Sequence, residues 1–183
     1  MTEQFQLCIV IPCYNEEKRI KTESISSFIK SHKNVLLCFV NDGSNDNTLN
    51  LLHKIKDDYP NNVVVISMEK NSGKAETVRF GILYCNKSFI VEKIAYLDAD
   101  FATTLEECYE ISEHINNEVV FAFGSRISKI DNKIQRKKMR HFIGRVIATF
   151  ISNQLKLTVY DTQCGCKIFN AELSKNLFSE KFI

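Results

Sequence analysis

Short apolar runs and longer amphipathic stretches alternate along the first hundred residues of the chain. The apolar runs cover residues 6–11, 35–40, 63–66 and 94–97. Between them, apolar residues recur at helical spacing over 16–31, from Asn45 or Asp46 onward, and over 73–85. Strands that alternate with helices across short connections predict an α/β fold, a mostly parallel sheet with helices on its faces.

Polar clusters follow the apolar runs directly, at the point where each predicted strand ends. They contain Pro12 to Glu16, Asn41 to Ser44, Asn71 to Lys74 and Asp98 to Asp100. Open parallel sheets bind ligands beyond the carboxyl ends of their strands. We therefore expect these loops to meet at one edge of the sheet and to form a single site.

The pattern changes after Thr103. It predicts a helix over 104–115, a strand over 119–123, a long helix over 139–157, a short strand over 167–169 and a last helix from Ala171. The long helix is basic at its start, which fits either a core-facing helix with a solvated end or an amphipathic helix on an anionic membrane. No further strand closes the sheet, so we expect a domain that is truncated at its C-terminus.

Composition restricts the class of protein. The chain has 183 residues, of which 44% are hydrophobic and 25% charged, as in one ordinary globular domain. Two prolines and six glycines argue against a disordered or fibrous chain. A formal charge of +2 does not indicate nucleic acid as a partner. The basic residues crowd one stretch, which contains Lys133, Arg136, Lys137, Lys138, Arg140 and Arg145.

The seven cysteines are odd in number and irregular in spacing. Their pattern matches no disulfide framework and no zinc-finger spacing, and most lie in or beside apolar runs as small hydrophobic residues. A reducing cytoplasm is the compartment that this usage predicts. The chain shows no signal peptide and no apolar run of about 20 residues. We expect a cytoplasmic protein, with a peripheral contact at the cytoplasmic face of a membrane left open.

The segment Asp98-Ala99-Asp100, a DXD motif, is the strongest chemical signal. Two carboxylates separated by one residue can share a hard cation such as Mg²⁺ or Mn²⁺, together with substrate phosphates. Such a metal neutralises charge on a leaving diphosphate. The alternative is an acidic loop or an Asp that caps the next helix. Two carboxylates alone do not separate Mg²⁺ from Mn²⁺.

The two preceding loops have the composition of turns that also suit a nucleotide. Gly43 permits an unusual backbone angle, Ser44 or Asn45 can cap the next helix, and Asp42 can accept a hydrogen bond from a base N–H. Lys74 follows Gly73 at a predicted helix start, where free N–H groups and an ammonium both attract phosphate. The spacing is not that of a Walker A loop. Simple turn and capping chemistry is the alternative for both loops.

Taken together, these loops resemble family 2 glycosyltransferases of the GT-A fold. The resemblance rests on Ile9-Val10-Ile11-Pro12-Cys13-Tyr14-Asn15-Glu16, Asn41-Asp42-Gly43-Ser44, Asn71-Ser72-Gly73-Lys74 and Asp98-Ala99-Asp100, in that order. The segment from Asp161 to Phe169 (Asp-Thr-Gln-Cys-Gly-Cys-Lys-Ile-Phe) is similar to the polyprenyl-phosphate sugar synthases, the dolichyl-phosphate glucosyl- and mannosyltransferase branch. The family usually has two acidic residues where this chain has Asn41-Asp42.

The resemblance implies one GT-A domain over 1–183, a Rossmann-like three-layer α/β/α sandwich with a nucleotide-binding half (1–100) and an acceptor-binding half (101–183). It implies a nucleotide pocket lined by Pro12, Tyr14, Glu16 and Asp42, with Lys74 near the diphosphate and the metal on Asp98 and Asp100. It assigns the acceptor phosphate to Arg126 and one of Arg136, Arg140 or Arg145. Asp161 and Asp100 are the catalytic candidates.

The resulting hypothesis is an inverting transferase that moves a hexose from UDP-glucose or GDP-mannose to a polyprenyl phosphate. Such an acceptor is already ionised near neutral pH, so Asp161 positions groups; a sugar hydroxyl would instead make it the base. The alternatives are a transferase with a saccharide acceptor and a non-catalytic nucleotide-binding module. A nucleotidyltransferase is disfavoured, because the loop after the first strand lacks a Gly-rich, basic sequence.

Overall fold

The computed structural model describes residues 3–125 and 164–181. Within these residues, six strands form one sheet in the order β3-β2-β1-β4-β6-β5. The strands are β1 (Gln4–Cys13), β2 (Val35–Asp42), β3 (Val63–Met68), β4 (Ile90–Leu97), β5 (Phe121–Phe123) and β6 (Cys166–Asn170). The helices are α1 (Thr22–Ser31), α2 (Thr48–Asp58), α3 (Lys74–Ser88), α4 (Leu105–Ser112) and α6 (Ala171–Leu177).

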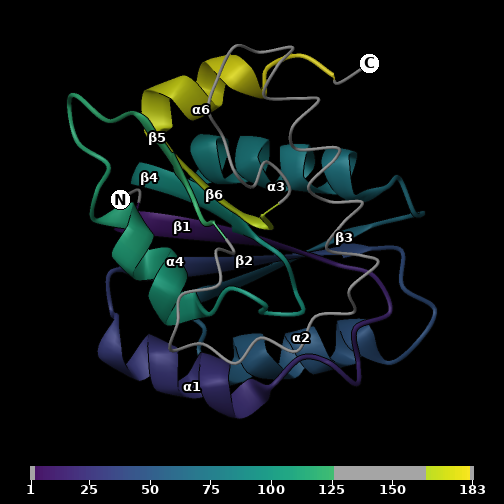
Figure 1. Cartoon of the computed structure of the whole chain (residues 1–183). Helices are drawn as coiled ribbons and strands as arrows, with labels where there is room; N and C mark the ends of the chain where they lie inside the picture. The colour runs from purple at the N-terminus through teal and green to yellow at the C-terminus, as the bar shows by residue number, and fades with distance from the viewer. Residues whose placement is uncertain (1–2, 126–163, 182–183) are drawn as a thin grey trace, which may run out of the picture.

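The first four strands are parallel, and β6 is antiparallel to both β4 and β5. The sheet is therefore mixed but mostly parallel, which confirms the expected α/β class. Helices α1, α2 and α4 cover one face, and α3 and α6 cover the other, so the fold is a three-layer sandwich (Figure 1).

Alternate residues of β1 supply the two cores. Leu7, Ile9 and Ile11 face the layer of α1, α2 and α4, whereas Cys8 and Val10 face α3. This is the period-2 alternation of a strand that is buried on both faces, which is why its sequence is a continuous apolar run.

All seven cysteines are buried free thiols, as the absence of a disulfide pattern predicts. Burial raises the pKa of the Cys8 thiol and of the Cys13 thiol well above the usual range, because the interior disfavours the thiolate. These side chains act as core hydrophobes. None of the helices in the described part of the chain is both long enough and apolar enough to span a bilayer.

Two local predictions were wrong. Residues 17–19 form a turn instead of the start of a helix, and α1 begins only at Thr22, because the backbone of Lys21 is extended. The N–H groups of Glu16 and Glu17 donate to Thr48, the first residue of α2, and to Asp46 before it. Helix α2 begins at Thr48 after Asn47, so neither Ser44 nor Asn45 caps it. The predicted helix over 139–157 lies outside the described residues.

Candidate active site

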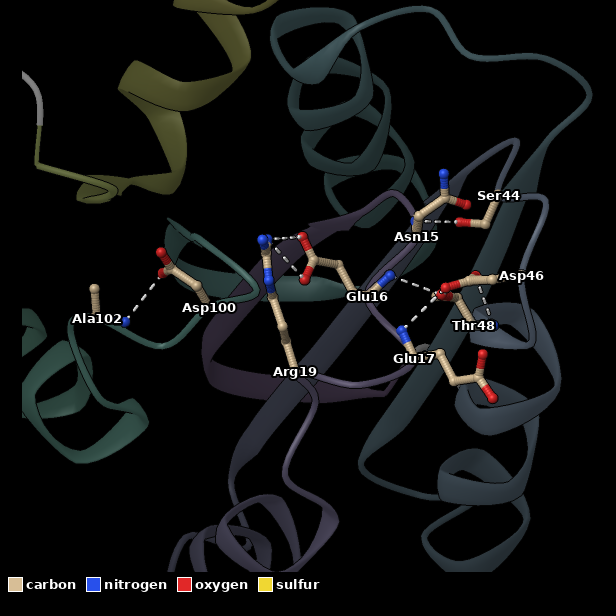
Figure 2. A network of polar contacts seen from close by, with 9 residues as sticks. All are labelled: Asn15, Glu16, Glu17, Arg19, Ser44, Asp46, Thr48, Asp100 and Ala102. Carbon is tan, nitrogen blue, oxygen red and sulfur yellow. Dashed lines mark hydrogen bonds and ion pairs between the residues drawn. The ribbon is translucent and has the colours of Figure 1, made fainter.

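The loop after β1 and the loop after β2 are bound to each other by a series of hydrogen bonds (Figure 2). The N–H of Asn15 donates to Oγ of Ser44 at 3.0 Å, and the N–H of Asn45 donates to Oδ1 of Asn15 at 2.9 Å. The N–H of Glu16 donates to Oγ1 of Thr48 at 2.8 Å. The two loops therefore form one unit, and Tyr14, the residue before Asn15, is 44% exposed.

Asn15 has a backbone conformation that explains its residue type. Its φ is +55°, in the left-handed region that asparagine tolerates better than most residues. In that conformation its N–H and its side-chain carbonyl both reach the loop after β2. Sequence analysis did not single out Asn15 as a site residue, because its bonding partners lie about 30 positions away.

Asp42 joins the loop after β2 to the loop after β3. Its Oδ1 accepts the N–H of Ser72 at 2.7 Å, and its Oδ2 accepts the N–H of Gly73 at 3.1 Å. The side chain is buried. Gly43 has φ +64°, and a Cβ there would lie 2.7 Å from the N atom of Asn71, so a glycine is required for the two loops to approach. Asp42 thus fixes the backbone at the start of α3.

Lys74 and Asp98 form an ion pair between the start of α3 and the end of β4. The partner atom is Oδ1 of Asp98, which is buried and has no polar partner other than this ammonium among the described residues. On its other side the carboxylate lies against Gly165, where a Cβ would come within 2.2 Å of Oδ2. The N–H of Asp98 also donates to the Gly165 carbonyl at 2.9 Å. Gly165 is thus a further site residue, and its signal in the sequence is a glycine between two buried cysteines.

Asp100, two residues after Asp98, lies near Arg19 and Glu16 of the loop after β1 (Figure 2). Its Oδ1 accepts the N–H of Ala102 at 3.0 Å, and the intervening Phe101 has a strained φ of +49°. Burial raises the pKa of Glu16 and the charge of Asp100 raises it further, against the lowering effect of Arg19, whose guanidinium lies 3.3 Å from Glu16. Negative charge is therefore concentrated at this point of the sheet edge.

A divalent cation fits this donor set. Asp98 and Asp100 offer carboxylate oxygens, the ligands that Mg²⁺ and Mn²⁺ prefer. One of these oxygens, Oδ1 of Asp98, is buried and already faces a cation, the ammonium of Lys74. Among the residues that the structure describes, no set of three or more His, Cys, Asp or Glu side chains is placed to hold a metal alone. Substrate phosphates would have to supply the remaining ligands.

The sheet edge brings together the donor-side residues expected from the sequence, which are Pro12, Tyr14, Glu16, Asp42, Lys74, Asp98 and Asp100. The acceptor-side candidates Arg126, Arg136, Arg140, Arg145 and Asp161 lie outside the described residues. Their roles stay predictions.

Comparison with known proteins identifies the family. The family model described as glycosyl transferase family 2 matches residues 8–178. The dolichyl-phosphate beta-glucosyltransferase of Homo sapiens is 32% identical over 190 residues, covering 95% of this chain and 57% of that protein. Dolichyl-phosphate beta-glucosyltransferase ALG5A of Trichomonas vaginalis is 28% identical over 190 residues, covering 97% of this chain and 57% of the length of that protein. The chain spans little more than half the length of these two relatives.

A solved structure supports the fold. A mannosyltransferase from Pyrobaculum calidifontis, in complex with GDP-Man and Mn²⁺, matches with a TM-score of 0.61 and 14% identity, covering 97% of this chain and 48% of that one. The α/β sandwich is thus the GT-A fold. The chain belongs to glycosyl transferase family 2.

Proposed function

We propose that this chain is the donor-binding and catalytic part of an inverting glycosyltransferase that moves a hexose from a nucleotide sugar to a polyprenyl phosphate. The observation that carries the proposal is the similarity to dolichyl-phosphate beta-glucosyltransferases over 95% or more of the chain. The names of these relatives favour glucose as the sugar, so of the two predicted donors we propose UDP-glucose. The contacts that join the loops after β1, β2, β3 and β4 in series, ending at the Lys74–Asp98 pair, support it independently.

The donor would lie across the carboxyl ends of β1, β2 and β4. The exposed ring of Tyr14 offers a face for the base, and Asp42 orders the loop beside it. Lys74, at the N-terminus of α3, presents its ammonium and the free N–H groups of the helix to the diphosphate. Asp98 and Asp100 would hold a divalent cation, which neutralises the charge of the leaving diphosphate.

The acceptor phosphate needs no general base, because it is ionised near neutral pH. One of its oxygens forms the new bond to the anomeric carbon while the bond to the donor diphosphate breaks, and the diphosphate leaves with the electron pair. Attack from the face opposite the diphosphate inverts the configuration. Arg126, Arg140 and Arg145 are the predicted partners of the acceptor phosphate, since guanidinium pairs bidentately with phosphate.

Calorimetric titration tests the donor half of the proposal. UDP-glucose and GDP-mannose are titrated with and without Mn²⁺ into the wild type, into Asp100→Ala and into Asp57→Ala, which removes an exposed carboxylate of α2. We expect Mn²⁺-dependent binding of UDP-glucose that Asp57→Ala retains and Asp100→Ala loses. Binding that is equal in Asp100→Ala, with an unchanged circular dichroism spectrum, would contradict the metal site.

A transfer assay tests the acceptor half. The protein is incubated with radiolabelled UDP-glucose, Mn²⁺ and either undecaprenyl phosphate or a free oligosaccharide. Label that enters only the lipid phase supports a polyprenyl phosphate acceptor. Label that enters the oligosaccharide would replace it with a saccharide acceptor.

A further inference from the structure

An apolar cavity of about 510 Å³ opens beside the donor site, between α3 and α6. Its walls come from both helices and from β4, β5 and β6, and they include Val78, Phe121, Phe169 and Leu177. Phe121 and Leu177 are 39% and 48% exposed, so the apolar wall faces solvent at its mouth. The volume falls within the range of small-molecule sites, about 300–1,000 Å³. An exposed apolar wall of this kind indicates a surface that meets a ligand or partner.

Two ammonium groups in the lining of this cavity lie near one aromatic ring, and we call this part of the cavity its charged end. Lys74 and Lys167 both line the cavity, and their Nζ atoms are 5.9 Å and 5.2 Å from the centroid of the Tyr96 ring. Lys167 donates to Oη of Tyr96 at 2.7 Å and to the Cys164 carbonyl at 3.0 Å. Among the described residues these bonds use two of its three N–H donors, which leaves one for an anion.

The charged end of the cavity adjoins the candidate metal site. Lys74 lines the cavity and also pairs with Asp98, so the two sites share one side chain. Register supports this proximity, because Tyr96 pairs with Lys167 and the next residue of β4, Leu97, pairs with Cys166. A ligand whose anionic end reaches Lys167 therefore lies beside the proposed site of the donor diphosphate, with its apolar part against the apolar lining of the cavity.

We propose that this α3–α6 cavity binds the first isoprene units of the acceptor, with Lys167 as one further contact of its phosphate beside the predicted arginines; the proposal rests on the proposed function. Charge complementarity and the apolar wall together select an isoprenoid phosphate. A sugar or nucleotide would place hydroxyl groups against phenyl and aliphatic side chains without hydrogen-bond partners, which is costly. A neutral lipid would leave the lysine N–H without an anion.

Farnesyl phosphate, below its micelle concentration, is the probe for this cavity, and its binding is measured by titration calorimetry. Leu177→Glu places a charge in the apolar wall at an exposed position, so the fold should persist. Phe80→Glu is the matched control, because Phe80 is a similarly exposed helical residue that does not line the cavity. We expect Leu177→Glu to weaken farnesyl phosphate binding about tenfold and Phe80→Glu to leave it unchanged.

A second pair of variants tests the charged end. Lys167→Gln should weaken farnesyl phosphate binding and leave binding of farnesol unchanged, whereas Lys167→Arg should restore the affinity for the phosphate. Inorganic phosphate alone should bind much more weakly than farnesyl phosphate, because it leaves the apolar wall empty. Equal affinity for farnesyl phosphate and inorganic phosphate would overturn the proposal.

Mn²⁺-dependent binding of UDP-glucose, measured on the same samples, separates the two proposals. Farnesyl phosphate binding that Leu177→Glu does not alter would overturn the cavity as its site and leave the proposed function standing. A wild type that binds UDP-glucose but no farnesyl phosphate would overturn both the cavity and the polyprenyl phosphate acceptor. Binding that Leu177→Glu weakens, in a variant that still binds UDP-glucose, supports the cavity.

Discussion

At the scale of single residues, the space for the Asp98 carboxylate exists because residue 165 is a glycine and has no side chain. A Cβ at position 165 would lie 2.2 Å from Oδ2 and 2.3 Å from Cγ of Asp98. The Asp98 carboxylate can therefore pack against residue 165, directly before β6, only because that residue is a glycine. Gly165 does not have a positive φ, so close approach and not backbone freedom is the reason for its identity.

Gly165→Ala should displace the Asp98 carboxylate and weaken Mn²⁺-dependent binding of UDP-glucose by about tenfold, equivalent to about 1.4 kcal/mol. The control is a double-mutant cycle with Asp98→Asn. If Gly165 acts through the carboxylate, Gly165→Ala should have little further effect in the Asp98→Asn background. Equal losses in both backgrounds would indicate a general packing defect at β6 instead.

The pKa of Glu16 gives a second prediction at this scale. Burial and the charge of Asp100 hold this pKa above the usual glutamate range. Between the pKa of Glu16 in the unfolded state and its pKa in the folded state, the folded protein therefore binds more protons than the unfolded protein. The contribution of Glu16 to stability is then full below the unfolded pKa and falls as pH rises from about 4.3 through the folded pKa. Glu16→Gln removes this titration.

Urea unfolding of the wild type and of Glu16→Gln, at intervals from pH 4 to pH 7, measures the effect. We expect the free energy of unfolding of Glu16→Gln to rise relative to that of the wild type as pH increases from 4 to 7. Glu17→Gln is the control, because the carboxyl group of Glu17 is next to Glu16 in the chain and is exposed. A difference between Glu16→Gln and wild type that stays constant with pH would contradict the raised pKa.

At the scale of elements, α3 makes three different contacts along its length. Its first residue, Lys74, reaches Asp98, its Val78 lines the apolar cavity, and its Gly81 packs on the sheet. A Cβ at Gly81 would lie 2.5 Å from Cγ1 of Val10 and 2.7 Å from Cγ2 of Val40. The glycine therefore sets how closely α3 approaches β1 and β2, and so where Lys74 is placed.

Gly81→Ala should lower the free energy of unfolding by about 1–2 kcal/mol, because overpacking against Val10 and Val40 outweighs the gain of about 1 kcal/mol in helix propensity. Lys87→Ala, at an exposed position of the same helix, should change stability by less than about 0.5 kcal/mol. Chemical denaturation of both variants gives the two values. A Gly81→Ala protein that is more stable than wild type would show that the helix can move away from the sheet at little cost.

At the scale of the whole molecule, the candidate donor site is assembled from segments far apart in the chain. The loops after β1, β2, β3 and β4 and the start of β6 all contribute, and hydrogen bonds span up to 67 positions, from Asp98 to Gly165. Because each loop is hydrogen-bonded or ion-paired to another loop, a ligand that bridges them should bind only the folded state and raise its free energy of unfolding.

Thermal unfolding with and without chelator tests this coupling. UDP-glucose with Mn²⁺ should raise the free energy of unfolding by about 2.7 kcal/mol at about 100 times its dissociation constant. EDTA should remove most of this gain while the unliganded protein keeps its melting temperature. A gain from UDP-glucose that persists in EDTA would show that the diphosphate binds without a metal.

The sequence could predict the elements whose signals are local. The apolar runs identified all four parallel strands, and the resemblance of four motifs identified the family, now confirmed. Strand β1 extends two residues beyond the predicted run at each end, to Gln4 and Cys13. The predicted helix start at Glu16 was wrong, because the extended backbone of Lys21 separates this loop from α1. The N–H of Glu16 instead donates to Thr48, a tertiary partner that no local pattern reveals.

The sequence by itself therefore determined the α/β order and the family, because periodicity and short motifs are encoded within a few positions. It also predicted which residues bind the donor, and that assignment stays a prediction. The tertiary structure alone decided that Asp42 holds the start of α3, that Gly165 makes room for Asp98, and that Lys74 and Lys167 flank one apolar cavity. These relations depend on which strands become neighbours. Strand neighbours are selected by burial of the whole sheet and not by any one segment.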